Sequence, residues 1–236
     1  MILIEKTDIC GWEPAIRGMR NPLNSWGRSD TVFEPGRNDI EELGYNDFEL
    51  MKSLAIAGPV HAKYRRMITV YADITAPLYW WKEFDTYKVG TVANSCSTMH
   101  KIAAKEFELA DFSCEHLGVR ALENLEKTID TLNQYRELYN NGGTEYMTEC
   151  GSEDEGCRLI PIVYHKKDKN AWWQMIQLLP SSYNQKRTVM LNYEVLAGIY
   201  ISRKNHKLNE WLDFCDWVEG LPYSEFITGK YKEEIE

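Results

Sequence analysis

The stretch from Met67 to Thr75 alternates apolar and polar residues with a period of two. This alternation predicts a β-strand with one buried face, because successive side chains of a strand point to opposite sides. Ala76-Pro77 follows directly, and proline suits the first turn of a helix, where its missing amide would have no partner. We therefore expect a helix from Pro77 through Tyr87. A strand that leads straight into a helix indicates a fold that combines a sheet with helices.

Most of the remaining chain reads as helices separated by glycine and proline. Asn46 followed by Glu49 resembles a helix N-cap with its reciprocal partner. Leu159 to Tyr164 is expected to form a short strand after a polar loop. Spacing of apolar residues and the position of helix breakers give the expected helices, which cover about residues 47–57, 122–138, 168–179, 183–204 and 208–219.

Glycine and proline interrupt the N-terminal part of the chain repeatedly, so an irregular segment is expected over about residues 7–45. Three arginines, Arg17, Arg20 and Arg28, occur among these glycines. A guanidinium in such a loop can pair with an anion. The alternative is a solvated loop anchored by tryptophans, and the sequence leaves both interpretations open.

Length, charge and hydropathy limit the class of protein. With 236 residues, 44% of them hydrophobic, the chain suits one domain over 1–236. It contains no apolar run of roughly 18 to 20 residues, so no membrane is expected as a partner and a cytoplasmic location is predicted. The formal net charge of −9 argues against nucleic acid as a partner. A small anion such as a nucleotide stays compatible, because a few arginines in a pocket can reverse the local field.

No widespread catalytic or metal-binding motif occurs in the sequence. The six cysteines form no C-x-x-C pair, and the five histidines have no partner four residues away. We therefore predict no metal site, expect reduced thiols, and assign no catalytic residue from motifs.

The segment from Trp80 to His100 is the densest candidate for chemistry. Aromatic residues lie beside Lys82 and Lys88, and small hydroxyl and amide residues follow Gly90. Together they could hold a flat ring and hydrogen-bond a phosphate or a base edge. The alternative is an aromatic helix that packs into the core and is followed by a polar turn.

This segment resembles the signature region of the flavin-dependent thymidylate synthases. In that family an Ala-Pro helix entry leads to an R-H-R triplet, a serine, an Asn-Glu pair and a second serine. Asn94 and Ser97 fall on the asparagine and the second serine, and Thr91 lies near the first serine. Thr86-Tyr87-Lys88 stands where the triplet is, so Lys88 offers only a point charge in place of a guanidinium fork. We expect Tyr87 to stack on a flavin in place of the imidazole.

A second match lies near the C-terminus. Leu178-Leu179-Pro180, then Asn192, then Ser202-Arg203 resembles the family's V-L-P, Asn and Leu-Arg sequence, with Gln177 in place of an arginine before it. Asn192 and Arg203 are eleven residues apart, about three helical turns, which places them on nearly the same side of a helix. His206 resembles part of the helix start that follows in the family.

The resemblance implies an α+β fold: a single domain with a mostly antiparallel sheet flanked by long helices. It implies FAD as cofactor, NADPH and methylenetetrahydrofolate as co-substrates, and C5 methylation of a pyrimidine deoxynucleotide, most simply dUMP to dTMP. The family's homotetramer implies a homo-oligomer. Its residue roles imply nucleotide contacts from Arg203, Ser97, Lys88 and Gln177, and flavin contacts from Asn94, Asn192, Tyr87, Thr91 and His206.

Two further interpretations stay open. The first is a related enzyme that acts on a different pyrimidine nucleotide. The second is a flavin-free protein that binds nucleotides or partners on the same scaffold. The changed R-H-R triplet favours the second, whereas Arg203, Asn94 and Ser97 favour an enzyme. Arg17, Arg20 and Arg28 are candidates to restore the missing positive charge.

Overall fold

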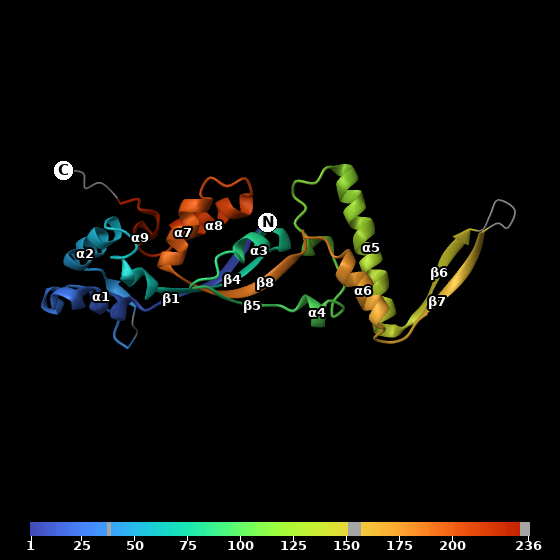
Figure 1. The fold of residues 1–236 in the computed structure, drawn as a ribbon, viewed down its shortest axis with the longest axis horizontal. Coiled ribbons are helices and arrows are strands. Elements are labelled where there is room, and N and C mark those ends of the chain that lie inside the picture. Colours follow the sequence, from blue (N-terminus) through green and yellow to red (C-terminus); the bar gives the residue numbers. More distant parts are fainter. Residues whose placement is uncertain (37–38, 151–156, 232–236) are drawn as a thin grey trace. The chain divides into compact units, whose positions relative to one another are not determined.

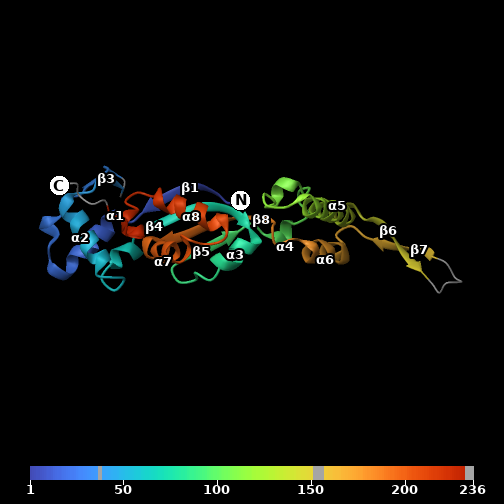
Figure 2. The same ribbon diagram turned by 90° about the horizontal axis from the view of Figure 1, so that it is seen from above.

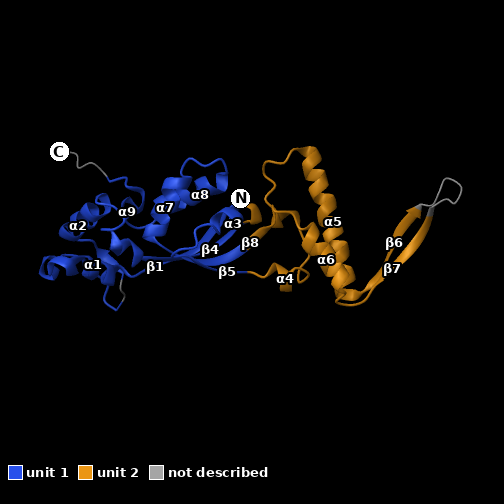
Figure 3. Ribbon diagram, in the orientation of Figure 1, with its two compact units in different colours: residues 1–76, 80–95, 186–236 blue, residues 77–79, 96–185 orange. Residues whose placement is uncertain are grey.

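The computed structural model describes residues 1–36, 39–150 and 157–231. These residues form two compact units (Figure 3). Unit 1 comprises residues 1–76, 80–95 and 186–236, and unit 2 comprises residues 77–79 and 96–185. A single domain over 1–236 therefore stays a prediction. No helix in the described part of the chain is both long and apolar enough to cross a membrane.

Unit 1 is built on a four-stranded sheet with the order β1-β4-β8-β5 (Figure 1). Its strands are β1 (Leu3–Cys10), β4 (Thr69–Pro77), β8 (Asn184–Asn192) and β5 (Val92–Ser95). The β1–β4 and β5–β8 pairs are antiparallel, with Ile4 opposite Ile74 and Asn94 opposite Thr188. Strand β4 is the alternating stretch of the sequence, and the apolar side chains at 70, 72 and 74 are buried, as the period of two predicts.

Helices cover one face of this sheet (Figures 1 and 2). They are α3 (Leu78–Phe84), α7 (Tyr193–Arg203) and α8 (Asn209–Glu219). Aromatic rings fill the interface: the Trp80 centroid lies 4.8 Å from that of Trp81 and 4.7 Å from that of Trp211. All three rings are fully buried. The tryptophans that looked like a possible ligand wall therefore form the core, as the alternative interpretation stated.

The helix expected over 183–204 is wrong in its first half. The chain forms strand β8 up to Asn192 and only then the helix α7. Asn192 is the N-cap of α7, where its side chain accepts a hydrogen bond from the Val195 amide at 3.0 Å. Asn192 and Arg203 do belong to the same helix, as expected. Asn192 lies at its N-terminal end and Arg203 at its C-terminal end.

The irregular segment expected over 7–45 contains regular structure. Strand β1 runs to Cys10, and helix α1 (Trp12–Arg20) follows at once. Gly11 joins them with a φ of 94°, a conformation that favours glycine. Trp12, Ala15 and Ile16 are buried at helical spacing, which is the sequence signal for α1 that the glycines and prolines obscured. Shorter elements follow: η1 (Asn21–Leu23), η2 (Trp26–Arg28), β2 (Val32–Phe33) and β3 (Ile40–Glu42).

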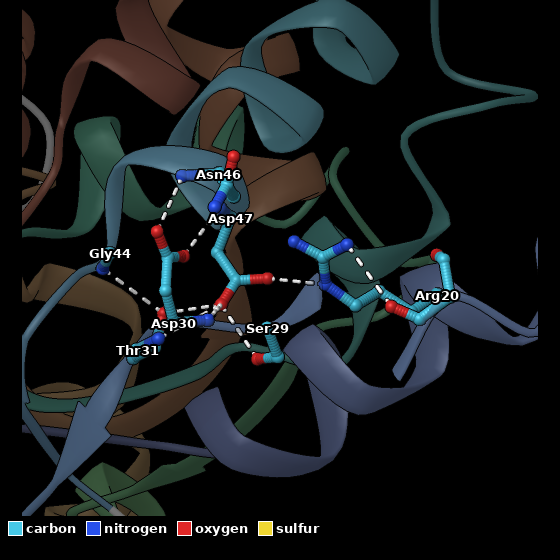
Figure 4. Close-up of polar contacts among 8 residues, drawn as sticks. Arg20, Ser29, Asp30, Thr31, Gly44, Asn46 and Asp47 are labelled. Atoms are coloured by element: carbon cyan, nitrogen blue, oxygen red, sulfur yellow. Dashed lines mark hydrogen bonds and ion pairs between the residues drawn. The ribbon is translucent and has the colours of Figure 1, made fainter. Parts of the chain in front are cut away.

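A buried polar network ties this segment to helix α2 (Tyr45–Ile56), as Figure 4 shows. The Asp47 carboxylate is fully buried. It accepts hydrogen bonds from Arg20 Nε at 2.6 Å, from the hydroxyls of Ser29 and Thr31 at 2.7 Å, and from the amides of Asp30 and Thr31 at 3.1 Å. Burial raises the pKa of Asp47, but these hydrogen bonds outweigh burial and hold its pKa below the ordinary value.

The expected Asn46–Glu49 capping pair does not form the start of α2. Asp30 accepts from the amides of Asn46 at 2.9 Å and Asp47 at 3.1 Å, so a residue remote in sequence caps the helix. The remaining elements of unit 1 are η3 (Lys63–Arg66) and α9 (Glu225–Thr228).

Unit 2 packs two helices, α5 (Val119–Asn141) and α6 (Lys169–Leu178), around a second apolar core. Leu132 and Met175 are fully buried there. The unit also contains α4 (Thr98–Lys101), η4 (Leu109–Asp111) and a two-stranded hairpin of β6 (Gly143–Cys150) and β7 (Cys157–Tyr164). The expected polar loop therefore begins as a strand, and the part that follows Cys150 lies outside the described residues.

Glu145 connects this hairpin to α5. Its two carboxylate oxygens accept from the hydroxyls of Tyr135 at 2.9 Å and Tyr164 at 3.0 Å. Burial and the carboxylate raise the pKa of both tyrosines. A two-stranded hairpin is marginal in water, so it depends on such contacts.

Tyr164→Phe should therefore destabilise the hairpin locally by about 1.5–3 kcal/mol, the range for a lost hydrogen bond to a charged group. Hydrogen exchange of the β6 and β7 amides measures this effect as faster exchange. Tyr146→Phe is the matched control, because Tyr146 is 63% exposed on the same hairpin and its hydroxyl has no hydrogen-bond partner among the described residues. Equal acceleration by both variants would contradict the role given to Glu145.

Candidate functional site

Arg203, the last residue of α7, lies at the centre of a polar and aromatic cluster in unit 1. Its Nε donates to the Tyr87 hydroxyl at 2.8 Å, and its Nη1 donates to Glu83 Oε2 at 2.7 Å. Nη1 also lies 3.0 Å from His206 Nε2, and the guanidinium carbon lies 4.6 Å from the Trp211 ring centroid. These five residues are called the Arg203 cluster below.

The cluster joins segments that are far apart in the sequence. It brings together three residues that the sequence analysis selected, Tyr87, Arg203 and His206. It also contains two that were missed. Glu83 comes from α3, and the buried Trp211 of α8 donates from its Nε1 to Glu83 Oε2 at 2.8 Å. The one available signal for Glu83 is its position four residues before Tyr87, which would place both on one side of the helix that the sequence predicts over Pro77 to Tyr87.

A pocket of about 340 Å³ adjoins the cluster, because Tyr87 belongs to both. It is lined by Phe84, Asp85, Tyr87, Lys88, Thr91 and Ala93. Lys88 is exposed and has no ion-pair partner in the described ranges. The Thr91 hydroxyl oxygen is buried and no hydrogen bond to it is found among the described residues. The pocket therefore offers an aromatic wall, one positive charge and one unsatisfied hydroxyl.

Gly90 brings this loop against α7. Its φ is 76°, and a Cβ at this position would lie 3.0 Å from Asn192 Nδ2. Asn192 thus approaches the loop through its amide nitrogen while its oxygen caps α7. Asn94 is exposed on β5 opposite Thr188. A flavin role for Asn192 and Asn94 stays a prediction.

Two predicted nucleotide contacts belong to unit 2. Ser97 is the N-cap of α4, where its hydroxyl accepts from the His100 amide at 3.0 Å. Gln177 is exposed on α6. Their participation in one site with Arg203 stays a prediction.

The structure excludes one of the three N-terminal arginines as a source of the missing positive charge. Arg20 is 3% exposed and is bonded to Asp47, so the hypothesis is wrong for this residue. Arg17 Nη1 lies 3.6 Å from Glu13 Oε1 on the surface of α1.

A second arginine near the pocket is also paired with a carboxylate. Arg187 Nη1 donates to Asp85 Oδ1 at 2.7 Å, and its guanidinium carbon lies 4.2 Å from the Trp81 ring centroid. Arg203 thus forms an ion pair with Glu83, near the end of α3, and Arg187 forms one with Asp85, just after it. The pairing leaves Lys88 as the main positive charge of the pocket.

The pocket fits one part of a flavin dinucleotide better than the other. Phe84 and Tyr87 suit a flat ring, and the unsatisfied Thr91 hydroxyl suits a ring nitrogen or carbonyl. Lys88 supplies a point charge for a phosphate but no bidentate fork. The residues therefore fit the ring of the cofactor, and they provide little for a diphosphate.

Comparison with solved structures identifies the architecture. A flavin-dependent thymidylate synthase, ThyX, from Helicobacter pylori, solved with FAD and dUMP, has a TM-score of 0.59 and 17% identity over 98% of this chain and 99% of its own. A second structure of that enzyme with FAD and dUMP has a TM-score of 0.58 and 17% identity over 98% and 99%. The UMP/dUMP methylase PolB from Streptomyces cacaoi, bound with 5-Br UMP, has a TM-score of 0.55 and 11% identity over 97% and 95%.

The fold is that of the flavin-dependent thymidylate synthases. The predicted resemblance is thus confirmed at the level of the fold, and so is the α+β class with its mostly antiparallel sheet and long helices. No protein-family model and no curated protein sequence matches the chain. Shared structure at this identity does not carry the activity with it.

Proposed function

We propose that the chain methylates a pyrimidine deoxynucleotide at C5, most simply dUMP to dTMP, with FAD as cofactor. One observation supports this most: Tyr87 and Arg203, from the two segments that resemble the thymidylate synthases, are joined by a 2.8 Å hydrogen bond beside a pocket that contains Lys88. Two independent sequence matches thus supply two residues of one cluster of contacting side chains.

In this proposal the nucleotide contacts are those that the resemblance implies, from Arg203, Lys88, Ser97 and Gln177. Tyr87 forms the wall against which the flavin ring lies, and the Thr91 hydroxyl satisfies its hydrogen bond on that ring. Asn94, Asn192 and His206 complete the cofactor contacts. The flavin, when bound, supplies hydride transfer, with NADPH as reductant and methylenetetrahydrofolate as carbon donor. The protein itself binds, orients and excludes water, and no residue is assigned a catalytic proton transfer.

The proposal extends to assembly and location. We infer a homo-oligomer, a homotetramer by resemblance, in the cytoplasm. Sedimentation of the purified protein tests the assembly directly, and a monomer at all concentrations would contradict it.

Visible absorption of the purified protein tests the cofactor. We expect bands of bound flavin after reconstitution with FAD and removal of free cofactor. Thr91→Val keeps the shape of the side chain but removes its hydroxyl, so it should weaken flavin binding by about two- to tenfold, the range for one neutral hydrogen bond. Thr86→Val is the matched control, because the Thr86 hydroxyl donates to the Glu83 carbonyl and does not line the pocket. Absence of flavin bands from the wild-type protein would exclude the proposed enzyme.

A second candidate is a flavin-free protein that binds nucleotides. The pairing of both Arg203 and Arg187 with carboxylates favours it, because each pair removes a cation that could hold a cofactor phosphate. Nucleotide binding without flavin bands would select this candidate. If flavin binds, NADPH oxidation in the presence of dUMP, dCMP or UMP separates a thymidylate synthase from a related enzyme for another pyrimidine nucleotide.

A further inference from the structure

The Asp85 carboxylate is held in place at the wall of the pocket that contains Tyr87 and Lys88. Its Oδ1 accepts a hydrogen bond from Arg187 Nη1 at 2.7 Å. The Arg187 side chain is 14% exposed, and its guanidinium carbon lies 4.2 Å from the ring centroid of the buried Trp81. Because Arg187 is itself packed against the core, the ion pair keeps the carboxylate at the pocket.

The second oxygen of this carboxylate is available to a ligand. Among the described residues no hydrogen bond to Asp85 Oδ2 is found, and 50% of the Asp85 side chain is exposed. An ionised carboxylate only accepts hydrogen bonds, so Oδ2 suits an N–H or O–H group. The buried Thr91 hydroxyl, which also has no partner in this part of the chain, can donate to a carbonyl. The pocket therefore presents one charged acceptor and one donor.

These two groups match one edge of a flavin ring. On that edge the N3–H group lies between two carbonyl groups, so the ring presents a donor flanked by acceptors. Asp85 Oδ2 can accept from N3–H while the Thr91 hydroxyl donates to a carbonyl. A hydrogen bond to a charged carboxylate is roughly twice as strong as one between neutral groups. Asp85 is therefore the residue of the pocket from which a flavin ring gains most.

The phosphates of a flavin cofactor gain little at this site. Arg187 is paired with Asp85. Arg203 is likewise paired with Glu83. Lys88 offers a point charge without a bidentate fork, and a phosphate in the pocket also meets the like charge of Asp85. Recognition therefore depends on the ring, which riboflavin, FMN and FAD have in common.

We propose that Asp85 selects the flavin by accepting a hydrogen bond from N3–H of the ring, with Arg187 as the positioning residue that holds the carboxylate. This inference rests on the proposed function, since it concerns the cofactor of the same pocket. It also widens the class of cofactor, because the chain then binds riboflavin and FMN about as tightly as FAD.

Calorimetric titration of the full chain with riboflavin, FMN and FAD tests the breadth of the cofactor class. We expect their dissociation constants to agree within about fivefold, because one exposed point charge adds little to affinity. Binding of FAD that is tighter than that of riboflavin by more than this factor would overturn the inference and leave the proposed function standing. If no flavin binds the wild type, the proposed function fails together with the inference.

The role of Asp85 is tested with 3-methylriboflavin, in which a methyl group replaces the hydrogen of N3. The wild type should bind it about 10- to 100-fold more weakly than riboflavin, the range for a lost hydrogen bond to a charged group. In Asp85→Ala riboflavin itself should bind more weakly. The ratio of the two dissociation constants should then approach one, because the acceptor is gone and the methyl group has room. A ratio that stays at the wild-type value would overturn the assignment.

Asp216→Ala is the matched control. Asp216 is an exposed aspartate on α8 of the same unit and does not line the pocket, so its substitution makes the same change in net charge elsewhere. Both the affinity for riboflavin and the ratio for 3-methylriboflavin should equal those of the wild type. An equal fall of the ratio in this variant would attribute the effect to net charge and contradict the role of Asp85.

Further variants apply should Asp85→Ala fold poorly with Arg187 unpaired. Asp85→Asn keeps an oxygen for Arg187 and for N3–H but carries no charge, so the ratio should fall to about two- to tenfold, the range for a neutral hydrogen bond. Arg187→Met releases Asp85 and should lower the ratio too, whereas Arg187→Lys keeps a cation and should preserve more of it. An unchanged ratio in Asp85→Asn and Arg187→Met, with riboflavin still bound, overturns the inference.

Discussion

Asp47→Asn is expected to lower the free energy of unfolding by about 3–5 kcal/mol at neutral pH, the range for breaking one partner of a buried ion pair. The substitution leaves the Arg20 guanidinium, 3% exposed, without a countercharge. It also puts an amide group among donors: Ser29, Thr31 and the amide of Asp30 all donate to the present carboxylate. Urea unfolding monitored by tryptophan fluorescence measures the loss.

The pH dependence of this loss follows from the lowered pKa of Asp47. A carboxyl group whose folded pKa is depressed contributes stability that is fully present above its unfolded pKa, about 3.9. That contribution disappears as the pH falls through the folded pKa. The difference between wild type and Asp47→Asn should therefore be constant from pH 7 to pH 5 and shrink below pH 4. A difference that grows on acidification would contradict the assigned shift.

Two controls separate charge from capping. Asp30→Asn removes a charge next to Asp47 but keeps an oxygen that can cap α2, so it should cost less than about 1 kcal/mol. Replacing Arg20 by methionine in the Asp47→Asn background should recover part of the loss, because the unpaired buried charge is removed while the asparagine oxygen still accepts from Ser29, Thr31 and the Asp30 amide. If the double variant is less stable than Asp47→Asn alone, the unpaired Arg20 charge is not the cause of the loss.

The sequence predicted local features of this fold well and remote ones poorly. The period of two in β4 depends on adjacent residues and is confirmed, and a helix does follow it directly. The predicted bounds of that helix, Pro77 through Tyr87, are too wide, because Pro77 is the last residue of β4 and α3 ends at Phe84. The segment of β8 was read as helix because its apolar residues also fit a helical spacing. Its strand state is decided by pairing with β5, about 95 residues earlier in the chain, which no local pattern reports.

The same limit applies to polar contacts. Asp30 caps α2 from 16 and 17 residues away, whereas the local Asn46–Glu49 pattern pointed to a cap that does not form. Glu83 and Arg203 are 120 residues apart. A glutamate on a short helix is usually read as solvated, so its role at Arg203 becomes visible only when α3 and α7 are placed on one sheet. Family resemblance selected Arg203, Tyr87 and His206, but it carried no information about Glu83, the acid that pairs with Arg203.

Arg203→Ala should weaken the binding of deoxyuridine and dUMP alike by about 10- to 100-fold, because a charged donor to a ligand oxygen contributes about 1.5–3 kcal/mol. Loss of fold should be slight, since Glu83 is 35% exposed on its side chain and keeps its bond from Trp211. The equal loss is the informative part. If Arg203 held a phosphate instead, dUMP would weaken and deoxyuridine would not. Calorimetry on both ligands, with thermal unfolding as the check on stability, therefore decides which atom of the ligand this arginine contacts.

Lys204→Ala is the matched control, because that residue follows Arg203 on the exposed side and does not contact the Arg203 cluster. A comparable loss in Lys204→Ala would show that the effect is one of general charge.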